Sequence, residues 1–171
     1  EIRAILGDGF RCLTLNDFPA APPVVEDAAT FAGNATKKAT ELARWLSGVP
    51  SSELQDLSFV LADDSGLEVD ALNRAPGVHS ARFSVNEKPS GNSSDPANTE
   101  KLLRLLKDVP SEKRTARFHC VIALTPVLPT KTGASSPVCY SDESELQTKL
   151  FEGECEGKII FAPRGDRGFG Y

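Results

Sequence analysis

The sequence predicts an α/β fold in which helices flank a mixed, twisted central sheet. Segments with helical periodicity and segments with strand periodicity interleave along the chain, which is typical of this class. The later strand-like segments alternate between apolar and polar residues, which favours some antiparallel pairing. The chain has 171 residues, of which 40% are hydrophobic and 25% are charged. That is enough for a sizeable core, so we predict one domain over residues 1–171.

The first third of the chain is expected to hold a short helix, a strand and a long helix. Residues 1–6 resemble the end of a helix, and residues 11–15 alternate like a strand. Residues 16–26 contain three prolines, which favour an extended connection. The long helix is expected from about Thr30 to Leu46, with Asp27 or Thr30 as its cap and a stop at Gly48 and Pro50.

The long helix carries a cation on its apolar side. At about 100° per residue, five apolar side chains share one face, namely Phe31, Ala35, Leu42, Trp45 and Leu46. Lys38 falls in the middle of that face, and Asn34 lies one turn earlier at its edge. Lys38 could extend along the apolar surface to reach water, or it could serve an anion close to the core.

Two adjacent acids follow a short apolar run in the middle of the chain. Residues 59–62 suit a strand buried on both faces, and we expect it to end at Asp63, Asp64, Ser65 and Gly66. Open α/β sheets commonly place ligands at strand ends. Because side chains alternate along a strand, one carboxylate can enter a cleft while its neighbour has a supporting role.

The second half of the chain is expected to complete the sheet. In chain order, the predicted elements are a strand-like stretch over 67–72, a surface loop over 86–95, a helix over 96–106, a strand over 114–124, a polar loop over 126–144 and a strand over 147–160.

Charge and composition exclude several classes of function. The net charge of −5 and the pI near 5.1 argue against broad binding to nucleic acid or anionic membranes. No apolar run approaches the roughly 20 residues of a membrane span, and the N-terminus does not resemble a signal peptide. The four cysteines are far apart, without paired zinc-ligand spacing. We therefore predict a cytoplasmic protein with reduced thiols, and no nucleic-acid or membrane partner.

Both ends of the chain look incomplete. The sequence opens on residues of mid-helix character without a capping residue, and it closes on a glycine-rich turn. We expect the domain to be incomplete at both termini.

Four features of the sequence could carry chemistry together. They are the Asp63–Gly66 stretch, the acidic pair Glu26 and Asp27, Lys38, and the glycine- and aromatic-rich stretch 163–171. Each alone has a structural explanation: a turn, a solvated helix start, a lysine reaching water, or an ordinary loop. Jointly, two separated carboxylates, a lysine on a core-facing side and a glycine-aromatic loop predict a Mg²⁺–polyphosphate site.

The two histidines are predicted to be structural. Neither His79 nor His119 has a partner at metal-ligand spacing in the sequence.

At these residues the sequence resembles the non-canonical purine nucleoside triphosphate pyrophosphatases, also called inosine triphosphate pyrophosphatases (ITPases). The resemblance spans nearly the whole chain in the family's order. The matching blocks are Thr30-Phe31 to Lys38-Ala39, Ala62-Asp63-Asp64-Ser65-Gly66-Leu67, Ala75-Pro76-Gly77-Val78, Ser80-Ala81-Arg82-Phe83, Arg117-Phe118-His119-Cys120 and Gly168-Phe169-Gly170-Tyr171.

The resemblance implies Mg²⁺-dependent hydrolysis of ITP, dITP and XTP to the monophosphate and pyrophosphate, which cleanses the nucleotide pool. It also implies an ITPase-like fold of two lobes with an active-site cleft between them, and a homodimer. Asp64 is implied as proton acceptor and magnesium ligand, Glu26 as the second magnesium ligand, and Lys38 as a catalytic phosphate contact. The implied substrate-binding residues are Asn34, Lys38, Ser65, Phe169, Gly170 and Tyr171.

The sequence departs from the family's pattern at both ends and at one internal position. The family usually begins with a strand and a phosphate loop that precede this chain, and it ends with a Ser-His-Arg segment that selects the 6-oxo purine. Gly33 stands where glutamate is frequent. Two alternatives remain: a Maf-like pyrophosphatase for modified pyrimidine triphosphates, and a non-catalytic nucleotide-binding or interaction domain.

Overall fold

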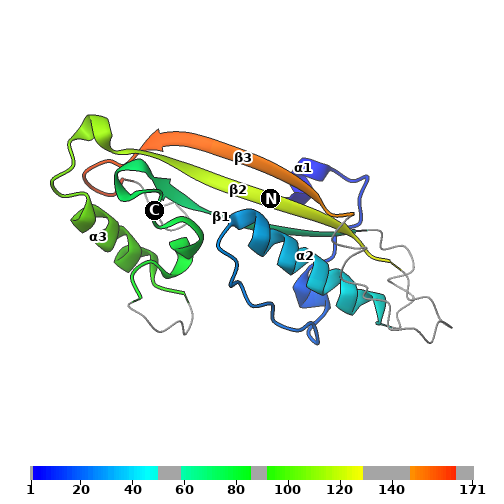
Figure 1. The fold of residues 1–171 in the computed structure, drawn as a ribbon. Helices are drawn as coiled ribbons and strands as arrows, with labels where there is room; N and C mark the ends of the chain where they lie inside the picture. The colour runs from blue at the N-terminus through cyan, green and yellow to red at the C-terminus, as the bar shows by residue number, and fades with distance from the viewer. Residues whose placement is uncertain (1, 50–58, 86–91, 129–146, 165–171) are drawn as a thin grey trace.

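The computed structural model describes residues 2–49, 59–85, 92–128 and 147–164. In chain order the helices and strands are α1 (Ile2–Leu6), α2 (Phe31–Ser47), β1 (Phe59–Val69), α3 (Asp95–Leu105), β2 (Thr115–Pro126) and β3 (Lys149–Lys158). Short 3-10 turns lie at Leu15–Asp17, Asp70–Leu72, Gly77–Arg82 and Ser111–Lys113. Figure 1 shows α2 along one half of the sheet and α3 beside the other half.

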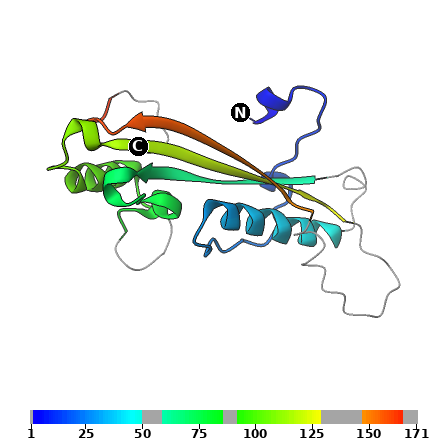
Figure 2. The same ribbon diagram turned by 45° about the horizontal axis from the view of Figure 1, so that its top comes forward.

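The sheet has three long strands in the order β1-β2-β3, and both pairings are antiparallel. Figure 2 shows the strands side by side in one long, curved sheet. Strand β2 follows β1 in the chain order of strands and pairs beside it in the opposite direction. The combination of helices with a sheet agrees with the predicted class. The predicted mixed sheet is not seen within the described ranges, where every strand pairing is antiparallel.

Strand β1 corrects the prediction that a strand ends at the two acids. It continues through them without interruption, and Asp63, Asp64 and Ser65 pair with Ile122, Val121 and Cys120 of β2. The predicted separate stretch 67–72 is the end of the same strand followed by a 3-10 turn. The long partner strand supplies backbone hydrogen bonds along the whole of β1, and these outweigh the turn preference of aspartate and serine.

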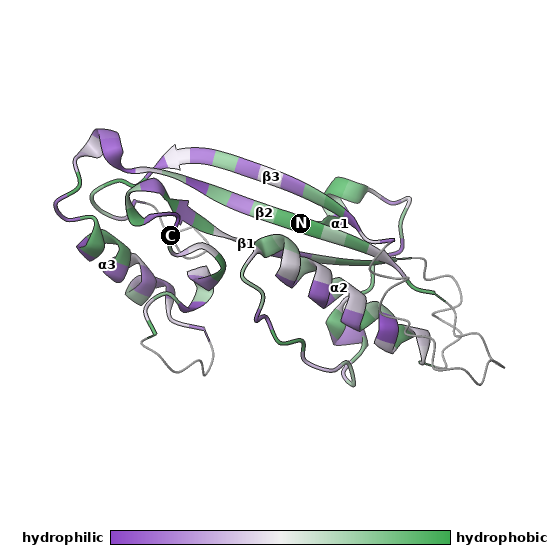
Figure 3. Ribbon diagram, viewed as in Figure 1, coloured by the Kyte–Doolittle hydropathy of each residue, from purple (hydrophilic) through white to green (hydrophobic). Residues whose placement is uncertain are grey.

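The two helices pack on opposite faces of the sheet. Helix α2 covers Val60 of β1 and Val121 and Ala123 of β2. Helix α3 lies in a second cluster with Leu67 and Val69, which have the opposite parity on β1. The sheet therefore joins two hydrophobic clusters, one at each end. Figure 3 shows hydrophobic colour on β2 where it passes α2 and alternating colour along β3, all of whose residues are exposed.

The other predicted elements are mostly confirmed. Thr30 caps α2, which ends at Gly48, and α1, α3, β2 and β3 lie within a few residues of their predicted positions. The strand predicted over 11–15 is wrong. There the amide of Thr14 and its hydroxyl both donate to Asp17 Oδ2, at 2.7 and 3.0 Å, and this local capping forms a 3-10 turn instead. None of the described helices is long and apolar enough to cross a membrane.

Candidate active site

The N-terminal half of α2 places a buried asparagine and a lysine toward β1. Thr30 Oγ1 accepts a hydrogen bond from the backbone N–H of Gly33 at 3.0 Å, which starts the helix. Asn34 and Lys38 follow four residues apart, so they lie one above the other on the same side. Asn34 is completely buried, and Lys38 keeps 24% of its side chain exposed.

Asp64 lies opposite these two side chains, and each of its oxygens accepts a hydrogen bond. Asn34 Nδ2 donates to Oδ2 at 3.1 Å, and Lys38 Nζ donates to Oδ1 at 3.2 Å. Asp64 is 8% exposed. A buried carboxylate needs a donor or a cation to offset its desolvation, and here it has both. The side chain is thus held in one orientation.

Glu26 completes the cluster from the loop before α2. Its Oε1 lies 3.5 Å from Lys38 Nζ, so one ammonium lies between two carboxylates from different segments. The loop is tied down on both sides: Ala28 N–H donates to Asn34 Oδ1 at 2.9 Å, and Arg82 Nη2 donates to the Glu26 carbonyl at 3.4 Å. Glu26 keeps 39% of its side chain exposed, which leaves an approach from solvent.

The structure does not bring every predicted site residue to this cluster. Ser65 and Asp63 are exposed on the other face of β1, because side chains alternate along the strand. The Ser65 side chain lines a hollow with Ser80 and Phe118 on that face. Phe169–Tyr171, the predicted nucleoside pocket, lie outside the described residues.

Asp27, next to Glu26, belongs to the surface rather than to this cluster. Its Oδ1 accepts from Lys37 Nζ at 2.6 Å. That hydrogen bond and the lysine's charge lower the pKa of the Asp27 carboxyl from its ordinary value. The structural explanation for this acid is therefore the right one, whereas Glu26 faces Lys38.

The cluster presents two carboxylates and one ammonium at a partly open surface. Carboxylate oxygens are the ligands that Mg²⁺ prefers, and an ammonium can contact a phosphate oxygen. The arrangement is suited to an anionic substrate carried with a hard divalent cation. Sequence periodicity singled out Lys38 for this role, but it did not indicate that Asn34 would hold Asp64.

Comparison with known proteins identifies the family of this chain. The model of the Ham1 family matches residues 1–171, which is the whole chain. The chain belongs to the Ham1 family.

Relatives in this family are similar over the full length of the chain. A dITP/XTP pyrophosphatase of Geobacter sulfurreducens is 45% identical, and one of Shouchella clausii is 39% identical; the match covers all of this chain and 70% of each relative. Among solved structures, a Ham1 protein from Coxiella burnetii superposes with a TM-score of 0.71 at 32% identity, covering 99% of this chain and 71% of that one. A nucleoside-triphosphatase, or dITP/XTP pyrophosphatase, from Mycobacterium abscessus gives 0.69 at 34% identity, covering 99% of this chain and 73% of that one.

Proposed function

We propose that this Ham1 protein hydrolyses non-canonical purine nucleoside triphosphates (ITP, dITP and XTP) to the monophosphate and pyrophosphate, with Mg²⁺ as cofactor. The observation that carries the proposal is the meeting of Asp64, Lys38 and Glu26 from three segments of the chain. The names of its relatives as dITP/XTP pyrophosphatases support the substrate class.

The residues present fit a magnesium ion. Asp64 Oδ1 and Glu26 Oε1 both lie within 3.5 Å of Lys38 Nζ, so two carboxylates already share one cation. Magnesium is commonly bound by one or two carboxylates, with water and phosphate oxygens in the remaining positions. Bound there, Mg²⁺ would neutralise charge on the triphosphate. We propose Asp64 and Glu26 as its ligands.

We propose that Lys38 stabilises charge on the phosphate and that Asp64 activates the attacking water. With a nucleotide present, the Lys38 ammonium contacts a phosphate oxygen and stabilises negative charge that develops during substitution at phosphorus. Asp64 orients the attacking water and takes its proton, a role that contributes roughly 10²–10⁴-fold in rate. Its fixed orientation matters because the water must be aligned with the bond that breaks.

Asn34 is proposed as a positioning residue rather than a substrate contact. Its side chain is fully buried, and both ends of the amide are used, one by Asp64 and one by Ala28. Ser65 would contact substrate through its backbone, because its side chain is exposed on the other face of β1. Phe169, Gly170 and Tyr171 are proposed to line the nucleoside pocket.

The decisive test is Asp64→Asn in the full-length protein, with Asp63→Asn as the matched control. The two substitutions are chemically identical and adjacent, but the side chains lie on opposite faces of β1. We expect Asp64→Asn to lower pyrophosphate release from dITP by about 10²-fold or more, and Asp63→Asn to stay within about threefold. An Asp64→Asn enzyme that keeps near-normal activity would refute the assignment.

A substrate panel separates the rival activities. Release of pyrophosphate from ITP and XTP, compared with dUTP and a methylated dTTP, distinguishes a purine enzyme from a Maf-like pyrimidine enzyme. Mg²⁺-dependent binding of a non-hydrolysable ITP analogue without turnover would instead favour a non-catalytic domain.

The remaining family properties also stay proposals. We propose a homodimer, for which sedimentation gives the mass, and a cytoplasmic location. We also propose two lobes, built around the two hydrophobic clusters, with the cleft on the Asp64 face of β1.

A further inference from the structure

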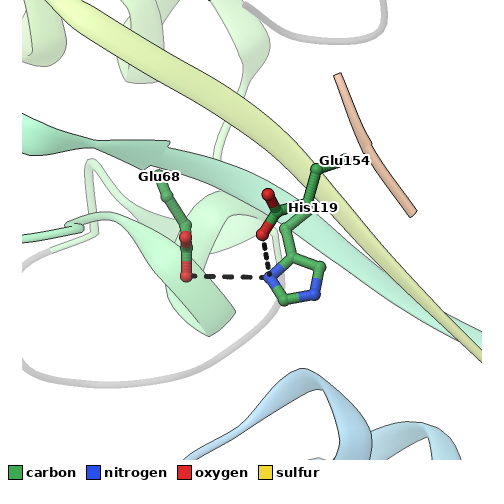
Figure 4. A group of neighbouring side chains, drawn as sticks. All are labelled: Glu68, His119 and Glu154. Carbon is green, nitrogen blue, oxygen red and sulfur yellow. Dashed lines mark ion pairs between the residues drawn. The ribbon is translucent and has the colours of Figure 1, made fainter. Parts of the chain in front are cut away.

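A second cluster of metal-ligand type lies on the same face of the sheet, beyond the start of α2. Glu68 of β1, His119 of β2 and Glu154 of β3 meet across three strands (Figure 4). His119 Nδ1 lies 3.9 Å from Glu68 Oε1 and 3.9 Å from Glu154 Oε1. Glu68 is four residues from Asp64 on the same strand, about 13 Å along it, so the two clusters are separate.

The strand register explains the meeting of these three residues. Glu154 pairs directly with His119, and Glu68 pairs with Arg117, two residues before His119. Alternation then puts all three side chains on one face. The His119 ring also packs edge-on against Phe31, with centroids 5.1 Å apart, which restrains the ring. The prediction that His119 is only structural rested on spacing within the sequence, and its partners come from two other strands.

Three buried polar atoms of this cluster make no hydrogen bond among the described residues. Glu68 is 8% exposed, and its buried Oε2 makes no hydrogen bond. Both ring nitrogens of His119 are buried and have no hydrogen bond either. Nε2 lies 3.9 Å from Glu152 Oε2, which is beyond hydrogen-bond distance. His119 Nδ1 and Glu68 Oε1 are 3.9 Å apart, too far for a hydrogen bond, and a cation bound between them would contact both.

The two arginines nearest Glu68, Arg74 and Arg117, do not form a hydrogen bond with its carboxylate. Arg117 makes close contacts elsewhere, to Glu156 Oε1 at 3.0 Å and to Asp70 Oδ1 at 3.1 Å. Its Nη1 and Arg74 Nη1 are each 3.6 Å from Glu68 Oε2, which is not the oxygen that faces His119. Three carboxylates (Glu68, Asp70 and Glu156) pair with these two guanidinium groups. Glu152 and Glu154 each lie 3.9 Å from a ring nitrogen of His119, so negative charge is in excess around the cluster.

We propose that Glu68, His119 and Glu154 bind a divalent transition-metal ion such as Zn²⁺, separate from the Mg²⁺ proposed at Asp64. One imidazole nitrogen and two carboxylate oxygens suit such ions, whereas Mg²⁺ prefers oxygen ligands alone. Ligand atoms around tetrahedral zinc lie about 3.4 Å apart. The two distances from His119 Nδ1 are 3.9 Å, and all three ligand atoms lie within 4.8 Å of one another, so side-chain rotation would bring the carboxylates inward to this spacing. Three protein ligands leave a position for water. The ion would join all three strands.

Zinc titration tests the proposal, and the chain's histidine content simplifies the measurement. The sequence contains only two histidines, so NMR of the imidazole nitrogens gives His119 as the reporter and His79 as an internal control. We expect saturating Zn²⁺ to shift the His119 ring signals and to leave those of His79 unchanged. Calorimetry of the Asp64→Asn variant should still show one bound Zn²⁺ ion per chain. Zn²⁺ binding that remains in this variant cannot be at the site proposed for catalysis.

Glu154→Gln and Glu156→Gln form a matched pair on the exposed strand β3. Both remove one charge from the same face, but only Glu154 faces His119 Nδ1, while Glu156 bonds Arg117. Glu154→Gln removes a ligand, so the affinity of this site for Zn²⁺ should fall by about tenfold or more. The affinity of the Glu156→Gln variant should stay within about twofold of the unsubstituted protein.

Three results would overturn the proposal: no shift of His119 with Zn²⁺, equal effects of the two variants, or loss of binding only when cysteine is replaced. Cys120 and Cys155 lie on the opposite face from His119 and Glu154, so thiolate binding would be a different site.

Discussion

Replacement of Asn34 by alanine tests whether the buried amide holds the catalytic carboxylate. The substitution removes the hydrogen bond to Asp64 Oδ2 at 3.1 Å and the one from Ala28 N–H at 2.9 Å. A hydrogen bond to a charged group contributes about 1.5–3 kcal/mol, and a neutral one about 0.5–1.5 kcal/mol. The site is fully buried, so water does not replace them without rearrangement. We expect a loss of about 2–4 kcal/mol in the free energy of unfolding.

The kinetic consequence follows from the same geometry. Asp64 without Asn34 keeps its charge and Lys38, but it loses the contact that fixes Oδ2. A shift of about 1 Å in a catalytic group can cost about 10²-fold in rate, so kcat for dITP should fall by roughly 10–100-fold. KM should change little, because Asn34 has no exposed surface with which to contact substrate.

Asn98→Ala is the matched control for this prediction. Asn98 is 1% exposed, and its amide also makes two hydrogen bonds, with Ser84 N–H at 2.8 Å and the Ser80 carbonyl at 3.3 Å. It lies on α3, so its loss should reduce stability without a matching fall in kcat. Urea unfolding and steady-state kinetics on both variants give the comparison. A loss of less than about 0.5 kcal/mol in Asn34→Ala would contradict the proposed role of Asn34, and so would a raised KM with unchanged kcat.

Two further predictions concern packing and pH. A Cβ on Gly66 would lie 2.6 Å from the Gly77 carbonyl oxygen, so Gly66→Ala should lower the free energy of unfolding by about 1–3 kcal/mol or more. Gly153 has nothing within 4 Å of such a Cβ, so Gly153→Ala should be nearly neutral. Thermal unfolding of both variants measures the difference, and equal melting temperatures would contradict the prediction. The Thr115 hydroxyl, 2.6 Å from Asp70, lowers the pKa of Asp70 from its ordinary 3.8, so its stabilising contribution is present above that pH and is lost as pH falls through the lowered pKa. Asp70→Asn should therefore flatten the acid side of the urea-midpoint profile between about pH 5 and pH 2, and an unchanged slope would contradict it.

Local patterns predicted the helices well. Thr30 provides a capping hydroxyl, Gly48 a stop, and the apolar spacing between them a face, and each acts over a few residues. The same periodicity placed Lys38 toward the core, and the structure confirms this with the contact to Asp64. Where the physical cause lies within one turn of chain, the sequence predicts the result.

The strands show why the remaining predictions failed. Asp63 and Asp64 have turn-forming propensity, so the strand was expected to end there, but β2 pairs with β1 for its whole length. Strand formation depends on a partner strand that is distant in the sequence, and the propensity of the local residues carries no information about that partner. The strand predicted over 11–15 was wrong for a different reason. Its residues alternate between polar and apolar, as in a strand, but Thr14 caps a 3-10 turn there.

The sequence by itself determined the residue types of the candidate site and, through the family resemblance, their proposed roles. Alternation along a strand also established that the two adjacent acids face opposite ways. Only the tertiary structure decided which face is buried under α2, that Asn34 holds Asp64, and that Glu68 and Glu154 meet His119. These contacts depend on register between strands separated by up to 86 positions, as with Glu68 and Glu154, and register is set by packing of the whole sheet rather than by neighbours in the chain.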